Sequence, residues 1–342
     1  MKNSKIEKPE EIRLAHGGGG RFSQQLIEEV FLPILGNKYL NPLDDSAVLN
    51  VPASRLAFTT DSFTVDPIFF PGGDIGKLAV CGTVNDISMV GAKPLYLSVG
   101  FIIEEGFLIS DLKLIVASIK KAAEEAGVII VTGDTKVVQR GKADGVYINT
   151  SGIGILRDGV EVSASKAQIG DSIVVSGPLG YHGMAVVTSR EDFGFRTKIK
   201  SDVAPLNHLV EKMLETTKNI HAMRDATRGG VATVLNEIAA QSQVGIELEE
   251  TKIPVGEEVR GACELLGFDP LYVANEGVLV AFVPSSEAKK IVDAMRKLSI
   301  GKKSAIIGRV VPEPAGKVVL RTQIGSHRIM DMLSGEQLPR IC

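Results

Sequence analysis

Apolar residues recur every three or four positions in several stretches of this chain, which is the spacing of one buried helix face. The stretch from Asp111 to Ala126 illustrates it, since Lys and Glu fill the positions between the apolar ones. The pattern predicts helices at Phe22 to Leu35, Asp74 to Val90, Asp111 to Ala126, His182 to Ser189, Ala204 to Glu215, Gly229 to Ser242, Val255 to Leu266 and Ser286 to Leu298.

Between these stretches lie short runs rich in β-branched residues, some of them bounded by glycine, which is typical of buried strands. They predict strands at Leu56 to Thr60, Leu95 to Ile103, Val128 to Thr132, Val146 to Ile155, Ile173 to Val175, Gly277 to Val283, Ser304 to Val311 and Val318 to Arg321. Because helices and strands alternate along the chain, the expected fold class is α/β or α+β.

One break in the pattern divides the chain. Between Leu156 and Gly170 the sequence Arg157-Asp158-Gly159 predicts a turn, and the apolar pattern restarts at Ile173. A chain of 342 residues is too long for one typical core. We therefore expect an N-terminal domain over residues 1–160, a C-terminal domain over 161–333 and a tail over 334–342.

Composition excludes several classes of protein. The net charge is −3 and no Lys/Arg block is present, which argues against a nucleic-acid-binding protein. No apolar stretch is long enough to span a bilayer, and charges rather than an apolar run follow Met1, so the expected location is the cytoplasm. Three cysteines without disulfide or zinc spacing fit a reducing compartment. Cys81 and Cys263 lie in apolar helical patterns and are expected to be inert core thiols.

The third cysteine, Cys342, is the last residue and follows a stretch that is short and polar for a core element. A thiol on a tethered end can act as a movable nucleophile or carrier, although a frayed end can also carry a cysteine by accident. Prenylation is excluded, because the modified cysteine would lie four positions from the end. With Gly335 as a hinge, the extended tail spans about 30 Å at about 3.3 Å per residue.

Acidic residues recur beside Gly, Thr or Asn in segments that we expect to be turns. The segments are Asp44-Asp45-Ser46, Thr59-Thr60-Asp61-Ser62, Asn85-Asp86, Gly133-Asp134-Thr135-Lys136, Arg224 to Gly230 and Asn275-Glu276-Gly277. Carboxylates with hydroxyl and amide neighbours are hard oxygen ligands suited to Mg²⁺ that bridges phosphates. Each acid alone is more often a helix cap or turn residue. Their recurrence favours a phosphate site.

A glycine run, His16-Gly17-Gly18-Gly19-Gly20-Arg21, precedes the first predicted helix. Backbone N–H groups there could approach an anion, with the helix N-terminus behind them, although a flexible linker has the same composition. No P-loop signature is present, and Gly152-Ile153-Gly154 lacks the third glycine of a dinucleotide fingerprint. No kinase or hydrolase signature is present either.

The segment from Asp86 to Pro94 resembles the D-x4-GA-x-P signature of the ATP-binding superfamily that includes aminoimidazole ribonucleotide synthetase, selenophosphate synthetase and thiamine monophosphate kinase. Within it the chain is similar to the HypE family of hydrogenase maturation factors. The likeness extends from His16 to Cys342 and includes TTDS at Thr59 to Ser62, FPGGDIGKLAVCGTVNDIS at Phe70 to Ser88, GDTKVV at Gly133 to Val138, HG at His182-Gly183, RDATRGG at Arg224 to Gly230, GFDPLYVANEG at Gly267 to Gly277 and the terminal PRIC. The sequence departs from the family pattern at Ala226, where Pro is common, and at Gly18, where other small residues occur.

The resemblance implies a two-domain PurM-like architecture. The N-terminal sheet would close a barrel across a homodimer, and the C-terminal domain would hold a mixed sheet. It also implies an ATP-dependent dehydration. A HypF-like carbamoyltransferase would carbamoylate Cys342, and ATP would convert this S-carboxamide to a thiocyanate. The cyanide would pass to iron on a HypC–HypD complex for NiFe hydrogenase.

The resemblance also implies roles for individual residues. Metal ligands would be Asp45, Asp61, Asp86 and Asp225, and the reaction at Cys342 would involve Lys136, Glu276 and Asp86. Nucleotide-binding residues would be His16, Gly17, Gly18, Gly19, Gly20, Asp45, Asp61, Lys77, Asp86, Asp134, Thr135 and Arg228. Asp134 would bind metal or orient Lys136, and ATP would favour an inserted tail. Two alternatives stay open: a sister enzyme that phosphorylates a small molecule, and a nucleotide-responsive scaffold without turnover.

Overall fold

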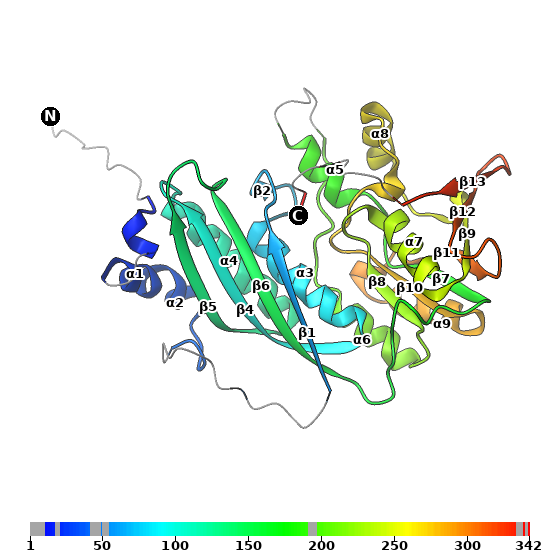
Figure 1. Cartoon of the computed structure of the whole chain (residues 1–342), viewed down its shortest axis with the longest axis horizontal. Coiled ribbons are helices and arrows are strands. Elements are labelled where there is room, and N and C mark those ends of the chain that lie inside the picture. The colour runs from blue at the N-terminus through cyan, green and yellow to red at the C-terminus, as the bar shows by residue number, and fades with distance from the viewer. Residues whose placement is uncertain are drawn as a thin grey trace.

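The computed structural model describes residues 11–17, 21–41, 49, 55–190, 197–332, 338 and 341–342. Figure 1 shows two sheets side by side, each with its own helices, and the C-terminus between them. The first sheet has the strand order β1-β6-β4-β5 and the second β13-β12-β9-β11-β7-β10-β8. The expected α/β class is therefore confirmed.

In the described residues, the first sheet carries helices on one face. Its strands are β1 (Leu56–Phe63), β4 (Ala92–Glu104), β5 (Ile129–Val138) and β6 (Val146–Leu156). Helices α3 (Ile75–Met89) and α4 (Ile109–Ala126) cover one face, with the continuous helical run of α1 (Arg21–Leu26), a π-helical segment (Ile27–Phe31) and α2 (Leu32–Leu35) beside them. A short hairpin, β2 (Phe69–Phe70) and β3 (Gly73–Asp74), leads into α3.

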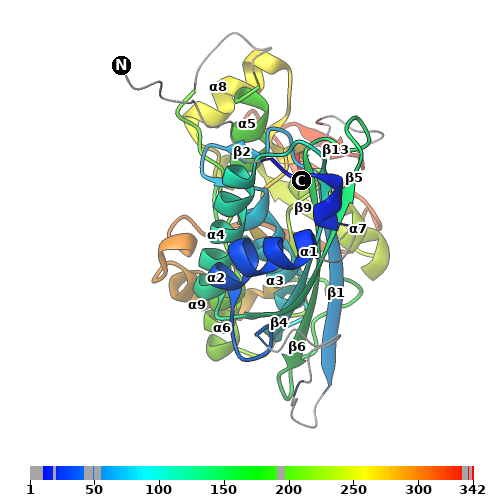
Figure 2. The same ribbon diagram turned by 90° about the vertical axis from the view of Figure 1, so that its left-hand side faces the viewer.

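The opposite face of this sheet carries no described helix (Figure 2). Phe58, Ile153 and Tyr96 are neighbours across three strands there, and the side chain of Phe58 is 71% exposed. Ile102 on the same face is 44% exposed. An apolar sheet face of this kind ordinarily has a cover. The predicted barrel across a dimer would cover this face. The barrel stays a prediction.

Helix α3 lies between the two sheets and is buried on nearly all sides. It contacts β1 and β6 of the first sheet, and also β8 and α6 of the C-terminal part. The close approach to β6 depends on Gly152 and Gly154, because a Cβ at either position would lie 2.6 or 2.4 Å from Ile87. These glycines therefore serve helix packing rather than a dinucleotide turn.

The second sheet is covered on both faces. Its strands are β7 (Asp171–Val175), β8 (Ala222–Asp225), β9 (Gly245–Glu249), β10 (Leu279–Pro284), β11 (Ala305–Val311), β12 (Val318–Arg321) and β13 (His327–Met330). Helix α7 (Gly230–Ser242) packs with Ile173 and Val175 on one face. Helices α6 (Asn207–Thr216) and α9 (Ser285–Met295) pack with Val174 on the other. Burial on both sides explains why β7 is apolar throughout. Helices α5 (Tyr181–Thr188) and α8 (Glu257–Leu266) flank this sheet.

All the predicted helices and strands are present, with ends shifted by a few residues. Strands β8, β9 and β13 were not predicted, because they are short and each carries charged residues. The expectation of turns is wrong at three acidic segments. Residues 59–62 lie within β1, Asn85-Asp86 within α3 and residues 133–136 within β5. Gly133 is required inside β5 by packing, since a Cβ there would lie 2.7 Å from the Val99 carbonyl oxygen.

Two further expectations concern the chain as a whole. The domain division at residue 160 stays a prediction. Among the described residues, no helix combines the length and apolarity needed to cross a membrane. Cys81 and Cys263 are buried, and burial raises the pKa of both thiols, as expected for inert core cysteines.

Candidate active site

The last two residues of the chain lie inside the molecule. Ile341 is 5% exposed and packs in the N-terminal core, and Leu338 also packs against that core. Arg228 donates a hydrogen bond from Nε to the Sγ of Cys342 at 3.2 Å. The expectation that the tail is too polar to pack is thus wrong at its end, because Leu338 and Ile341 supply apolar anchors. Residues 333–337, with the predicted hinge Gly335, lie outside the described part.

The backbone of the inserted tail is held by a buried histidine. His182, in the first turn of α5, is fully buried, and its Nε2 lies 2.8 Å from the carbonyl oxygen of Ile341. Its Nδ1 lies 2.8 Å from the Oγ of Ser201. Burial lowers the pKa of His182 to about 4, so the ring is neutral at ordinary pH.

Glu276 lies next to the thiol on a loop before β10, and it is 3% exposed. Its backbone N–H donates to Asp202 Oδ1 at 3.1 Å, and its carbonyl accepts from Asn85 Nδ2 at 3.3 Å. The preceding Asn275 ties the loop to Gly180 and Ala226. Burial raises the pKa of Glu276 well above its usual value, and the nearby Asp225 and Asp202 raise it further. A raised pKa makes the carboxylate of Glu276 a stronger base than an ordinary glutamate.

Three aspartates from separate elements meet beside this loop. Asp61 lies on the helix-facing side of β1, Asp86 on α3 and Asp225 at the end of β8. Thr59 Oγ1 donates to Asp86 Oδ2 at 2.9 Å. Burial, with repulsion from Asp86, raises the pKa of Asp61 to about 6 and that of Asp225 to about 7. Arg228 lowers the pKa of Asp61 and Arg224 that of Asp225, but neither cancels the rise. Crowded carboxylates of this kind are a favourable setting for a cation.

The fit to a divalent cation rests on this donor set. Carboxylate oxygens with a hydroxyl beside them suit Mg²⁺, and a cation would relieve the repulsion that raises their pKa values. Within the described ranges, no three acidic, histidine or cysteine side chains already stand in a metal-binding arrangement. Asp45, the fourth predicted ligand, lies outside the described residues, as do Asp44 and Ser46.

The inserted thiol is held in its protonated form. Burial raises the pKa of Cys342 to about 11, and the neighbouring Glu276 raises it as well, while Arg228 opposes them. Since the thiolate is the nucleophile, an inserted Cys342 is a poor acceptor for a transferred group. Loading of this sulfur is favoured only where the thiol reaches solvent.

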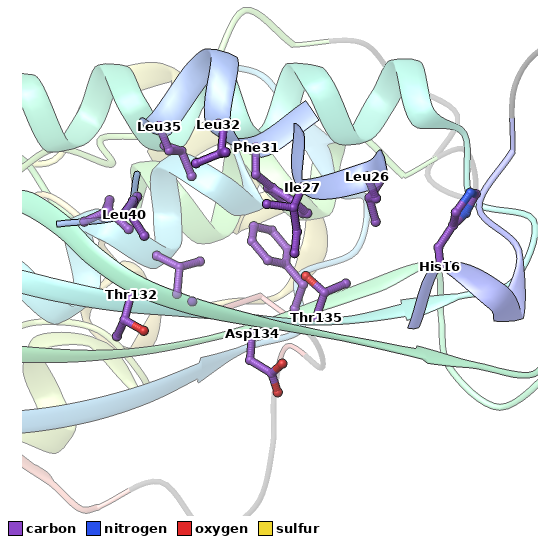
Figure 3. Close-up of a pocket in the computed structure, with 14 residues that line it drawn as sticks. His16, Leu26, Ile27, Phe31, Leu32, Leu35, Leu40, Thr132, Asp134 and Thr135 are labelled. Carbon is purple, nitrogen blue, oxygen red and sulfur yellow. The ribbon is translucent and has the colours of Figure 1, made fainter. Parts of the chain in front are cut away.

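A hollow of about 330 Å³, apart from the site around Cys342, lies between the N-terminal helical run and strand β5 (Figure 3). Leu26, Phe31 and Phe101 make its walls apolar, and His16 and Thr135 stand at its polar end. Asp134 contributes to the wall, but its carboxylate points to the opposite side of the strand (Figure 3). This cavity thus unites three residues predicted from two separate motifs. The predicted Gly18, Gly19 and Gly20 lie outside the described residues.

Two lysines predicted to be functional lie neither among the residues described around Cys342 nor in the lining of the cavity at β5. Lys136 is exposed and pairs with Ile102 on the open face of the first sheet, whereas Cys342 lies on the helix side. Lys77, in the first turn of α3, donates to the carbonyl of Gly72 at 3.3 Å. Gly17 ends a short 3-10 helix, Leu14–Gly17, ahead of α1.

Three residues around the tail were missed at the level of sequence: His182, Asp202 and Asn85. The signal for His182 was present, since it is the one charged or ionisable residue in α5, Tyr181–Thr188, apart from the tyrosine. Asn85 gave a signal too, as an amide beside Asp86 in a helix that is mostly apolar. Asp202 gave none, because its partners are distant in the sequence.

Comparisons with known proteins agree with this architecture. Models of the AIR synthase related protein match the chain as an N-terminal domain over residues 43–156 and a C-terminal domain over residues 168–321. Carbamoyl dehydratase HypE of Bradyrhizobium diazoefficiens is 53% identical, over 97% of this chain and 96% of that protein.

Solved structures give the same result. The crystal structure of hydrogenase maturation protein HypE in complex with ATP has a TM-score of 0.92 at 50% identity, covering 96% of this chain and 99% of that one. A HypE–HypF complex has a TM-score of 0.80 at 52% identity, covering 90% of this chain and 99% of that one. The chain belongs to the HypE carbamoyl dehydratase family of AIR synthase related proteins.

Proposed function

We propose that this protein dehydrates a carbamoyl group carried on its own terminal cysteine, using ATP, and so supplies cyanide for the iron of NiFe hydrogenase. One observation carries the proposal: Cys342 accepts a hydrogen bond from Arg228, and the buried carboxyl of Glu276 is near enough to raise the pKa of its thiol. The chain's 53% identity to a protein named carbamoyl dehydratase supports the same reaction. A kinase for a free small molecule would have no use for an inserted terminal thiol.

The reaction balances as follows. Attack of the S-carboxamide oxygen on the γ-phosphorus of ATP releases ADP and converts that oxygen into a phosphate ester. The nitrogen loses one of its two protons as this ester forms, and loses the second as the C–O bond breaks and inorganic phosphate leaves. Cys342 is left as a thiocyanate. The net change is the loss of one water from the carbamoyl group, coupled to hydrolysis of one ATP.

Two side chains at Cys342 match the demands of these steps. Glu276 has a raised pKa and a rigid backbone, so it suits removal of the nitrogen protons. Arg228 stays charged, because its pKa is raised by the neighbouring sulfur. Its guanidinium is suited to hold the carboxamide oxygen and to neutralise phosphate charge.

ATP requires two places to bind. The apolar cavity beside His16 and Thr135 suits the adenine ring, and the carboxylates of Asp61, Asp86 and Asp225 suit the triphosphate end with Mg²⁺. Mg²⁺ bound there would neutralise the charge of the transferring phosphoryl group. Asp45 and the glycine run at residues 17–20 belong to the same predicted set.

The two places are separated within one chain. Helices α3 and α4 occupy the helix side of the sheet between the cavity at β5 and the acids at β1. We therefore propose a homodimer in which the cavity and Lys136 of one chain serve the acids and Cys342 of the second. The exposed apolar face around Phe58 supports such a dimer.

The proposed reaction needs partners on both sides. A HypF-like carbamoyltransferase would load Cys342, in keeping with the existence of a HypE–HypF complex among the relatives. A HypC–HypD complex would receive the cyanide at its iron. Three free cysteines in the chain support a reducing compartment, which is the cytoplasm.

The test is the intact mass of the protein after incubation with the carbamoylating partner and carbamoyl phosphate, before and after Mg-ATP. Wild type should gain one carbamoyl group and then lose one water. Cys342→Ala should gain nothing, whereas the matched control Cys263→Ala should behave as wild type. Glu276→Gln should keep its carbamoyl group after ATP. A wild-type carbamoyl group that ATP leaves intact would favour the small-molecule kinase instead.

Mixed dimers test the shared site. Chains with Lys136→Ala and chains with Asp61→Asn should each be inactive alone. In a mixed dimer, the Lys136→Ala chain receives Lys136 from its partner and keeps its own acids, so only its tail should be dehydrated. Mass analysis distinguishes the two chains. Dehydration on the Asp61→Asn chain, or on neither, contradicts a site shared in this way.

A further inference from the structure

The inserted tail is held at two kinds of contact, one polar and one apolar. The polar contact joins His182 Nε2 and the Ile341 carbonyl oxygen at 2.8 Å. The apolar contacts are the side chain of Ile341 in the N-terminal core and Leu338, whose Cδ1 lies 3.4 Å from the ideal Cβ position of Gly183. His182 and Gly183 are consecutive in α5, so one helix end meets both parts of the tail.

The direction of the hydrogen bonds is determined by their chemistry. A carbonyl oxygen only accepts, so Nε2 of His182 must carry the hydrogen. The neutral ring then has Nδ1 as an acceptor, and the hydroxyl of Ser201 donates to it at 2.8 Å. The same hydroxyl oxygen accepts from the N–H of Val203 at 3.0 Å, which orients it. Ser201 therefore selects the tautomer that binds the tail.

The ring is also fixed by packing. Phe70 of strand β2 meets the His182 ring edge to face, with centroids 5.3 Å apart and planes at 86°. His182 belongs to α5 of the C-terminal part, and Phe70 and the Ile341 pocket belong to the N-terminal core. In Figure 1 the C-terminus accordingly lies between β2 and α5. The tail end thus fits only where the two halves of the chain meet.

We propose that His182 is a positioning residue that latches the C-terminal tail in its inserted position and so sets Cys342 beside Arg228 and Glu276. The latch rests on the proposed function for its purpose, since loading needs the thiol outside and dehydration needs it inside. A single neutral hydrogen bond contributes modestly to stability. The tail can therefore be released for a partner without unfolding any element.

Alkylation of Cys342 tests the latch without nucleotide or partner. The inserted thiol is partly buried and held protonated, so a released tail should react faster with iodoacetamide. His182→Leu keeps the volume apolar but loses the donor, and its Cys342 should react about tenfold faster at pH 8. His182→Gln keeps an N–H at the position of Nε2 and should return the rate to near that of wild type. Peptide mapping separates Cys342 from the two buried cysteines.

A matched control separates latching from general destabilisation. His221, which directly precedes β8, has a side chain that is 14% exposed, and its Nδ1 lies 2.9 Å from Asp171 Oδ2. His221→Gln should lower stability yet leave the Cys342 alkylation rate unchanged. If His182→Leu does not fold, Ser201→Ala takes its place, because loss of the hydroxyl donor should raise the alkylation rate several-fold. A folded His182→Leu or Ser201→Ala protein that alkylates at the wild-type rate overturns the proposal.

The reaction gives a second, independent measure. Carbamoyl loading of His182→Leu by the partner should be at least as fast as that of wild type, while single-turnover dehydration on the loaded protein should slow by about tenfold. A purely structural role would slow both steps together, and that result would also overturn the latch. If wild type is never dehydrated, the proposed function fails, but the alkylation result still decides the latch.

Discussion

Asn85 links the central helix to the loop of Glu276, and its replacement tests how that loop is positioned. Its Nδ2 donates to the carbonyls of Ala204 at 3.2 Å and Glu276 at 3.3 Å. Its Oδ1 accepts from the N–H of Leu206 at 2.7 Å. Asn85→Ala removes all three bonds, although the Glu276 carbonyl still accepts from the N–H of Ala204 at 3.4 Å.

The expected loss follows from the number of bonds. Each buried hydrogen bond contributes about 1 kcal/mol net, and a partner left unsatisfied costs about as much again or more. Asn85→Ala should therefore lower the free energy of unfolding by about 3 kcal/mol. A matched control exists in Asn236 of α7, which is also buried and donates twice, to Ala232 and Met330 at 2.9 Å. Asn236→Ala should lose about 2 kcal/mol.

The two variants separate stability from function. Urea unfolding measures the first, and single-turnover dehydration of the carbamoylated protein measures the second. Asn85→Ala should slow dehydration by about tenfold, because a small displacement of Glu276 misaligns proton transfer. Asn236→Ala should retain the wild-type rate under conditions where it is folded. Equal rates in the two folded variants would refute the argument that Asn85 positions Glu276.

Three further predictions concern other parts of the molecule. Phe58→Asp, on the open sheet face, should give monomers in sedimentation velocity. Leu114→Asp changes an exposed apolar residue on α4 and should leave the dimer intact. A dimer that persists in Phe58→Asp argues against the sheet face as the interface. Burial lowers the pKa of His182 from 6.5 to about 4, so between these pH values the unfolded chain binds one proton more than the folded chain. As pH falls from 6.5 to 4, the free energy of unfolding of wild type should therefore drop by about 3 kcal/mol relative to that of His182→Gln. Urea titrations measure this difference. A constant difference would contradict a buried neutral ring. Gly152→Val should lower the urea midpoint by overpacking against Ile87, at about 3 kcal/mol, and an unchanged midpoint would be inconsistent with the close approach of α3 to β6.

Much of the fold could be predicted from periodicity, but the locations of the acids could not. Asp61 and Asp134 lie in glycine- or threonine-rich segments that resemble turns, yet both are inside strands. The reason is that a turn and a functional strand use the same small polar residues, one for backbone freedom and the other for room beside a ligand. Only the sheet register shows that Asp61 faces the helices and that Asp134 lies on the opposite face.

The candidate site shows the same limit. Glu276, Asp225 and Cys342 were found because each lies in a distinctive motif, and the structure brings them together. An inserted tail was expected, but the apolar anchor that Ile341 supplies was not, because a pentapeptide with one arginine and one proline has no periodicity to interpret. His182 and Asn85 bind backbone carbonyls of distant segments, and such partners leave no trace in local sequence.

Helix α3 carries Asn85 and Asp86 as consecutive residues, one bonded to the Glu276 loop and the other within the aspartate group. The helix is packed on nearly every side and has no room to flex between them. The aspartate group and the loop of Glu276 beside the inserted thiol are therefore connected through one rigid helix. A ligand that displaces Asp86 is therefore expected to act on the Glu276 loop through the hydrogen bond from Asn85, without a separate relay.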